Sequence, residues 1–304
     1  MKYRIILKAV FMGLLALPLQ ALSGSMSEIE ARYTQLHAAE QAALSLGDAH
    51  ARNARIAERY QVLFAGLFAQ TALKAATVTD LHFLFQAARL PAFYTSEARY
   101  VDDMRRVLDA LAQHNAVTDR EREEMYVSLL SLRDFAAAQA LLQQSPQLHI
   151  DSPPVVPAGF DNPKVTAFDV DTSANMLMPL QLDVTHGEQL VVIAHPLCGF
   201  SRNAVAAIEQ DPAFARLLAA TTIWLAPVNG RLYLTEFRDW NGAHPHTRIV
   251  QAWHASSWPM ITDWASPQFY LLRDGKVVAH VVGWPKQGRK QELMALLEKM
   301  HGPE

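Results

Sequence analysis

A cluster of prolines divides the chain. Five prolines lie within residues 146–163. Proline fixes φ and lacks the backbone N–H that the interior of a helix or a sheet needs, so no regular element is expected to cross this stretch. A proline-rich segment is extended and acts as a spacer. The cluster therefore predicts two folded units, residues 24–145 and 164–304, joined by a linker over residues 146–163.

The segment before the first unit has the layout of an export signal. A basic start over residues 2–8 is followed by an apolar run over residues 9–19, and small residues between Ala21 and Ser25 offer a cleavage site. The apolar run is shorter than the roughly 20 residues that a membrane-spanning helix needs. We expect residues 1–23 to be removed as a signal peptide. The mature chain is then expected to be periplasmic or secreted, with no integral membrane span.

The first unit is predicted to be all helical. Between Ser25 and Ser145 there are two glycines, one proline and no tryptophan. Apolar residues recur there with the helical period; the stripes are Ile56-Tyr60-Leu63-Leu67, Leu81-Leu84-Phe85-Ala88 and Val101-Met104-Leu108-Leu111. Residues 125–142 resemble the second half of a tetratricopeptide unit, but no full copy recurs at a fixed period. A plain helical bundle and a groove that binds a protein partner both remain open.

The second unit alternates strands and helices. Strand patterns cover residues 165–170, 190–194, 222–226 and 268–272. Asp274-Gly275 then separates two apolar runs, which is a hairpin signal, and a last helix is predicted over residues 287–300. This order predicts an α/β sandwich with a mixed central sheet flanked by helices.

The charge balance disfavours polyanionic partners. The chain has 27 Lys and Arg against 30 Asp and Glu, a net charge of −3, and no basic cluster in either unit. Nucleic-acid binding draws on clustered basic residues, so no nucleic-acid partner is expected. His244, His246 and His254 suggest a metal site, but His244 and His246 are separated only by a proline and have no third ligand at a fixed spacing, so the signal is weak. Neither a metal nor a bound cofactor is predicted.

Cys198 is the only cysteine, so no internal disulfide can form. It follows the predicted strand over residues 190–194 and opens the next helix. The unpaired N–H groups and the positive dipole end at a helix N-terminus favour the thiolate. Ser201 lies one turn on, where its hydroxyl can face the sulfur, and His195 would stabilise a thiolate if charged. The alternatives are a buried, inert cysteine and a histidine that is simply hydrogen-bonded at a strand end.

The order of these features resembles the thioredoxin fold. Cys198-x-x-Ser201 opens a helix after a buried strand, and Ser266-Pro267 precedes the strand of the hairpin. Residues 164–190 also resemble the lead-in of periplasmic TlpA-like thioredoxins, and residues 196–202, Pro-Leu-Cys-Gly-Phe-Ser-Arg, are similar to the active-site run of monothiol glutaredoxins. The resemblance implies a cis proline at Pro267 beside Cys198 and a substrate-binding backbone at Ser266. Trp264, just upstream, is expected to face the substrate.

The sequence departs from that family in ways that limit its chemistry. Ser201 stands where two-cysteine members have their second cysteine, and Val192 and Leu197 replace the buried acid and the tryptophan of thioredoxins. The stretch between Cys198 and Pro267 is longer than in the minimal fold, which implies an insertion over about residues 230–260. The Gly-Gly pair that helps glutaredoxins hold glutathione is absent. Glutathione or another thiol is therefore expected only as a co-substrate.

These features predict an exported monothiol protein that exchanges thiols and disulfides of cell-envelope proteins. The thiolate of Cys198 would form a mixed disulfide, with Ser201 as the second catalytic residue, and a thiol from the substrate or from a small molecule would release it. The alternative is a non-catalytic scaffold or adaptor, in which the helical unit recruits a protein partner of the cell envelope.

Overall fold

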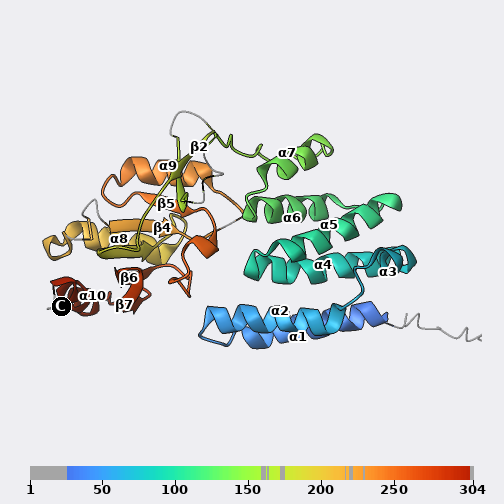
Figure 1. The fold of residues 1–304 in the computed structure, drawn as a ribbon, viewed down its shortest axis with the longest axis horizontal. Helices are drawn as coiled ribbons and strands as arrows, with labels where there is room; N and C mark the ends of the chain where they lie inside the picture. The colour runs from blue at the N-terminus through green and yellow to red at the C-terminus, as the bar shows by residue number, and fades with distance from the viewer. Residues whose placement is uncertain are drawn as a thin grey trace, which may run out of the picture.

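The computed structural model describes residues 26–301, apart from residues 159–161, 163, 172–174, 216, 219–221 and 229. The predicted signal peptide, residues 1–23, lies outside the described residues. In the described part of the chain, no helix combines the length and the apolar character that crossing a bilayer requires. Figure 1 shows two parts, a stack of helices from the N-terminal half and a sheet with its own helices.

The N-terminal part, here called the helical half, confirms the prediction of an all-helical region. Its helices are α1 (Glu28–Ala43), α2 (Ala49–Phe64), α3 (Gln70–Ala75), α4 (Val78–Thr95), α5 (Ala98–Gln113), α6 (Asp119–Ser131) and α7 (Phe135–Gln143). Side chains of Thr77, Thr118 and Asp134 accept hydrogen bonds from first-turn N–H groups and so fix where α4, α6 and α7 begin. α4 contacts α1, α2, α5 and α6, and its buried face forms the centre of the stack.

The second part, here called the sheet half, contains one seven-stranded mixed sheet in the order β2-β1-β5-β4-β3-β6-β7. The strands are β1 (Ala167–Val170), β2 (Leu177–Leu180), β3 (Glu188–Ile193), β4 (Thr222–Ala226), β5 (Ile249–Ala252), β6 (Gln268–Arg273) and β7 (Lys276–Val282). The pairs β3–β4 and β4–β5 are parallel, whereas β1–β2, β1–β5, β3–β6 and β6–β7 are antiparallel. β2 and β5, which the sequence analysis did not predict, are short, and β2 contains Pro179.

The helices of the sheet half cover only one face of the sheet. α8 (Gly199–Gln210) joins β3 to β4, α9 (Leu234–Ala243) joins β4 to β5, and α10 (Lys290–Glu298) follows β7. Both parallel connections step across the sheet in the same direction, so right-handed crossovers place α8 and α9 on the same side. Residues of all three helices share one core cluster with Val192 and Leu271.

Irregular segments cover the opposite face of the sheet. Trp258, Ile261 and Val184 cover it, packed on Val191 and Leu225. In the described residues these covering side chains come from irregular segments, with one 3₁₀ turn (Ala255–Ser257), and not from an α-helix of this half. The expected insertion over residues 230–260 contains α9 and β5, and the crossover to β6 after it runs over this face. The predicted mixed sheet with helices is confirmed, and the α-helices of this half lie on one face of it.

Four strands of the sheet nevertheless have a thioredoxin-like arrangement. The order β4-β3-β6-β7 combines a parallel pair joined by α8 with an antiparallel hairpin, and α10 packs against β6 and β7. These are the elements that the resemblance implied. They place the end of β3 and the start of β6 at the same edge of the sheet, because the two strands are antiparallel.

The two halves share a hydrophobic core, to which the sheet half contributes Phe168 and Val170 of β1 and Leu177 of β2. Arg133, in the turn between α6 and α7, is buried and donates hydrogen bonds to the carbonyls of Ala252 (2.9 Å) and Trp253 (3.0 Å). Its guanidinium also lies 5.1 Å from the centre of the Phe168 ring. Burial lowers the pKa of Arg133 to about 9, so the side chain still carries its charge at neutral pH. The described part of the proline-rich segment is also tied down, since the hydroxyl of Tyr126 donates to the carbonyl of Asp151 (2.8 Å).

Candidate functional site

Cys198 lies at the end of the loop that connects β3 to α8. The residue is the N-cap of α8, and its thiol donates to the carbonyl of Ser266, with Sγ 3.2 Å from the oxygen. Register explains this contact: Ile193 at the end of β3 lies opposite Gln268 at the start of β6. The peptide bond between Ser266 and Pro267 is cis, as the resemblance implied. Two segments far apart in the sequence therefore meet at the sulfur.

The surroundings of the sulfur favour its charged form. Cys198 is half-buried, whereas Ser201 is 1% exposed. The Oγ of Ser201 accepts a hydrogen bond from the N–H of His195 (3.3 Å), which leaves its own hydrogen for the sulfur. Burial raises the pKa of Cys198. Hydrogen bonds from the N–H of Ser201, the hydroxyls of Ser266 and Ser201, and the N–H of Phe200 outweigh that effect, so the pKa lies below that of an ordinary thiol.

His195 does not provide a positive charge for the thiolate. Burial lowers its pKa, and the nearby carboxylate of Glu236 offsets this only in part, so the ring is neutral at pH 7. Its Nδ1 accepts from the N–H of Leu197 (3.2 Å), which places the ring proton on Nε2. Tyr233 and Phe237 pack edge-on against the ring. Of the two interpretations of His195, the hydrogen-bonded residue at a strand end is the one that the structure supports.

Exposed apolar side chains surround the cysteine. Leu197 is 46% exposed, Phe200 61% and Val282 52%. The N–H of Gly283 donates to the carbonyl of Pro267 (2.9 Å), which holds the end of β7, and with it Val282, beside the site. Single exposed apolar residues are common, but several around one reactive group mark a contact surface.

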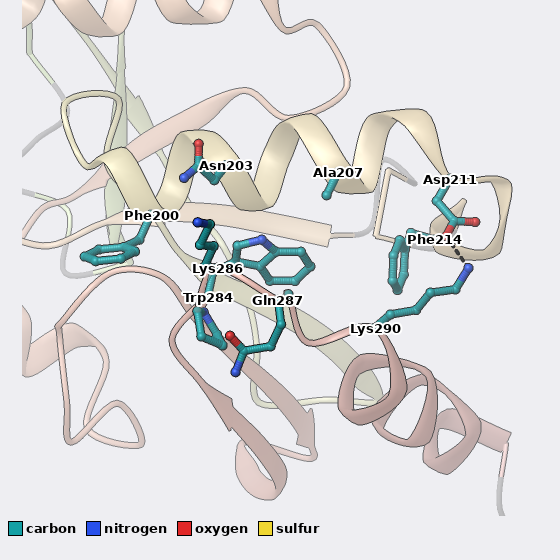
Figure 2. Close-up of a pocket in the computed structure, with 11 residues that line it drawn as sticks. Phe200, Asn203, Ala207, Asp211, Phe214, Trp284, Lys286, Gln287 and Lys290 are labelled. Atoms are coloured by element: carbon teal, nitrogen blue, oxygen red, sulfur yellow. Dashed lines mark ion pairs between the residues drawn. The ribbon is translucent and has the colours of Figure 1, made fainter.

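A pocket of about 470 Å³ opens beside α8, beyond Phe200. Figure 2 shows Phe200 at one end of it and the ion pair between Lys290 and Asp211 (2.5 Å) at the other. Trp284 provides an apolar wall, and Lys286 contributes an amine. The pocket can hold a small molecule with both apolar and anionic groups.

Trp264 lies in a second and larger cavity. This cleft, of about 1110 Å³, runs between the two halves and is lined by Trp264 and Ala265 on the side of the sheet. Trp258, the other tryptophan close upstream of Pro267, is 1% exposed and donates from Nε1 to the carbonyl of Thr166 (3.0 Å), so it belongs to the core. Of the predicted residues, Cys198, Ser201 and Ser266 meet at the sulfur, whereas Trp264 lines the neighbouring cleft.

A polar cluster that was not predicted from the sequence holds the segment before Ser266. Gln268 is fully buried, and its Oε1 is 3.1 Å from the hydroxyl of Tyr270 and also bonds His280. The same hydroxyl donates to the carbonyl of Asp263 (3.0 Å), and the ring of His280 stacks on that of Tyr270. The signal in the sequence is a glutamine at the start of an otherwise apolar strand.

No metal centre is formed by the described residues. Among them, no group of three or more His, Cys, Asp or Glu side chains could hold an ion. His244 instead bonds Glu209 (3.1 Å) and stacks on Trp240.

No protein family and no curated protein matches the chain. Among solved structures, it is similar to a thioredoxin-like protein from Bacteroides caccae ATCC 43185, known from a crystal structure at 1.90 Å resolution. The similarity covers 81% of this chain and 85% of that one, at 16% sequence identity and a TM-score of 0.29. The resemblance to the thioredoxin fold is one of strand order, in four strands of the sheet half.

Proposed function

We propose that this protein is an exported thiol–disulfide exchange protein that acts through mixed disulfides with Cys198. The observation that carries the proposal is the position of the sulfur: half-exposed at the start of α8, beside Ser266, and surrounded by N–H and O–H donors. Such surroundings are typical of reactive cysteines, whereas inert cysteines are buried among apolar groups.

The reaction has two exchange steps. The thiolate of Cys198 attacks one sulfur of a substrate disulfide; a new S–S bond forms, the old one breaks, and the other substrate sulfur leaves as a thiolate that takes a proton from solvent. A second thiolate, from the substrate or from a small molecule, then attacks the mixed disulfide and releases Cys198. Because Cys198 is the only cysteine, the electrons pass between two outside molecules, and the chain itself ends unchanged.

Substrate binding is assigned to the backbone at Ser266 and to the apolar rim. Among the described residues, the N–H of Ser266 has no hydrogen-bond partner, so an extended substrate can pair with it as an added strand does. Leu197, Phe200 and Val282 offer apolar contacts around the same point. These features support a protein substrate in the cell envelope rather than a rigid small molecule.

The pocket beside α8 is a candidate binding site for the molecule that provides the second thiol. Lys286 can pair with a carboxylate, and Trp284 supplies apolar contact. A small acidic thiol such as glutathione has this combination of groups. Glutathione is thus proposed as a co-substrate that completes the cycle and not as a resident cofactor.

A comparison of the wild type with Cys198→Ser tests the proposal. Wild-type protein is expected to form mixed disulfides with a peptide disulfide, detected as a mass increase that reductant removes, and the variant is expected to lose exchange by roughly 100-fold or more. Export is checked by sequencing the N-terminus of the secreted product, with cleavage expected between Ala21 and Ser25. If Cys198 titrates near about 8.5, the value of a free thiol, and the variant exchanges as fast as the wild type, the proposal is wrong.

The alternative function is a scaffold or adaptor that binds a protein partner without chemistry. The tight joint between the two halves favours it, since a fixed pair of surfaces suits recruitment. Partners that stay bound in reductant and with Cys198→Ser would support this function over exchange.

A further inference from the structure

We propose that the cleft between the two halves binds the substrate chain on one side of its reacting cysteine. The substrate is then an extended polypeptide that carries an aromatic or large aliphatic side chain a few residues from that cysteine. This inference rests on the proposed function and makes the helical half part of the substrate-binding surface.

The lining of the cleft comes within one residue of Ser266 in the sequence. Ala265 and Trp264 line it, and Ala265 is joined directly to Ser266, whose carbonyl contacts the sulfur. Pro227 and Val228 line it as well, just after β4. Because β3 and β4 are parallel, both strands end at the same edge of the sheet, where Cys198 lies.

The far wall of the cleft comes from the helical half and is aromatic. Phe93 and Tyr94, near the end of α4, line it, and their rings pack edge-to-face at 5.1 Å. Phe93 is 71% exposed, although much of the rest of α4 is buried. An exposed aromatic ring opposite Trp264 is suited to hold an apolar side chain between the halves.

The size of the cleft fits a chain better than a small molecule. Its volume of about 1110 Å³ exceeds the roughly 300–1,000 Å³ that is usual for small-molecule pockets. Each residue of an extended chain spans about 3.3 Å, and Trp264 is two residues from Ser266, so the side chains held here would be roughly two to five positions from the substrate cysteine.

The charges of the cleft do not select an ionic partner. Arg99 and Glu97 form an ion pair with each other (2.9 Å), and Arg52, Glu58 and Asp263 are the other Arg, Lys, Asp or Glu residues that line the cleft. Because the acids exceed the arginines by only one, apolar contact and backbone hydrogen bonding are the main sources of affinity. This combination is that of a polypeptide and not of a nucleotide or an acidic peptide.

Two disulfide probes carrying the same chromophoric leaving group test the inference on the full chain. One probe is a nine-residue peptide with a central cysteine flanked by phenylalanine and leucine; the other is N-acetylcysteine amide. The wild type is expected to react about ten times faster with the peptide. Phe93→Ser is expected to remove most of that advantage and to leave the rate with the small probe unchanged, and Trp264→Ala is expected to lower the rate with the peptide.

Val62→Ser is the matched control, because Val62 is 65% exposed in the same half, on α2, and does not line the cleft. It should keep the advantage for the peptide. If Phe93→Ser behaves as Val62→Ser does, or if the wild type does not prefer the peptide, the inference fails while the proposed function stands. If neither probe reacts faster with the wild type than with Cys198→Ser, the proposed function itself fails. A dimer that Phe93→Ser dissociates would identify a second copy as the occupant and overturn the inference.

Discussion

The helical half and the sheet half use their buried polar residues differently. In the helical half, Glu121 completes the cap of α6, and Arg133 faces the other half. In the sheet half, Ser201 lies in the first turn of α8 and Gln268 at the start of β6, both at the edge where Cys198 lies. The helical half thus uses these two groups for its own fold and for the joint. In the sheet half, Ser201 and Gln268 lie at the edge of Cys198, while other buried polar residues, such as Asn241 and Gln251, hold α9 and β5 in place.

This difference indicates a division of labour that depends on the joint. The sheet half holds Cys198, and the helical half adds the wall with Phe93 to the cleft beside it. That wall can contribute to substrate binding only if the two halves keep a fixed orientation relative to each other. Substitutions at the joint should therefore mainly change the stability of the whole chain, whereas substitutions beside the sulfur should mainly change its chemistry.

Arg133→Ala is expected to have the largest effect on stability, a loss of about 3 kcal/mol in the free energy of unfolding. The substitution leaves the carbonyls of Ala252 and Trp253 without their donor and removes the contact with the ring of Phe168. Urea unfolding followed by two signals measures it. Tryptophan fluorescence reports on the sheet half, which contains all six tryptophans, and far-ultraviolet circular dichroism reports mainly on the helices.

Arg105→Ala is the control for this comparison. Arg105 is 44% exposed and pairs with Asp102 one turn away, so its loss should lower the free energy of unfolding by less than about 0.5 kcal/mol. Equal effects of the two substitutions would show that Arg133 does not tie the halves together. Two separated unfolding transitions in Arg133→Ala alone would sharpen the comparison, because they would identify the joint as the source of cooperativity.

Gly230→Ala is expected to have the next largest effect on stability, a decrease of about 2 kcal/mol in the free energy of unfolding. A Cβ at Gly230 would lie 2.2 Å from the carbonyl oxygen of Val127 in α6, and a backbone atom cannot turn away as a flexible side chain can. The same urea titration measures it. Gly242→Ala in α9 is the matched control, since a Cβ there meets nothing within 4 Å. In a helix, that change should raise stability by about 0.5–1 kcal/mol.

If both glycine substitutions lower the free energy of unfolding, or if neither does, this explanation of the joint is wrong. A loss only at Gly230 would show that close contact between the halves, and not a general need for glycine, explains the residue. The expected effect is smaller than for Arg133 because a loop can shift by a few tenths of an ångström, whereas a missing guanidinium cannot be replaced.

The sequence predicted those parts of the fold whose signal lies within one element. The helical stripes, the strand before Cys198 and the hairpin at Asp274-Gly275 depend on local patterns, and the structure contains them. β5 was not predicted because it has only four residues and includes the buried Gln251, whose amide donates to the distant carbonyl of Leu232 (3.0 Å).

The joint and the cleft were not predictable because their contacts join distant segments. Arg133 looks like an ordinary residue of a turn between two helices, and its partners are more than a hundred residues away. Phe93 looks like another apolar residue of a helical stripe, and only the fold reveals that it is exposed. In contrast, Cys198 and Ser201 share one helix start, so their proximity follows from the sequence itself.

Ser201→Ala is expected to have the smallest effect on stability of the three substitutions, and its main effect is on the sulfur. The substitution removes a hydroxyl donor from the thiolate, so the charged form becomes less favourable and the pKa of Cys198 rises. Below that pKa the thiolate fraction falls, so alkylation by iodoacetamide at pH 7 should slow severalfold, whereas at pH values well above the pKa the rates should converge. The rate of alkylation is measured from pH 5 to pH 10, and the midpoint of its rise with pH gives the pKa of Cys198.

Ser256→Ala, at an exposed serine in the 3₁₀ turn, controls for the loss of a hydroxyl and should leave the midpoint unchanged. The N–H of His195 also loses its acceptor in Ser201→Ala, which should lower the free energy of unfolding by about 1 kcal/mol. Arg133→Ala should lower the free energy of unfolding without changing the pKa of Cys198. Ser201→Ala should change that pKa and lower the free energy of unfolding by a smaller amount than Arg133→Ala does. A midpoint that moves equally in both variants would mean that the joint, and not the start of α8, sets the charge of the sulfur.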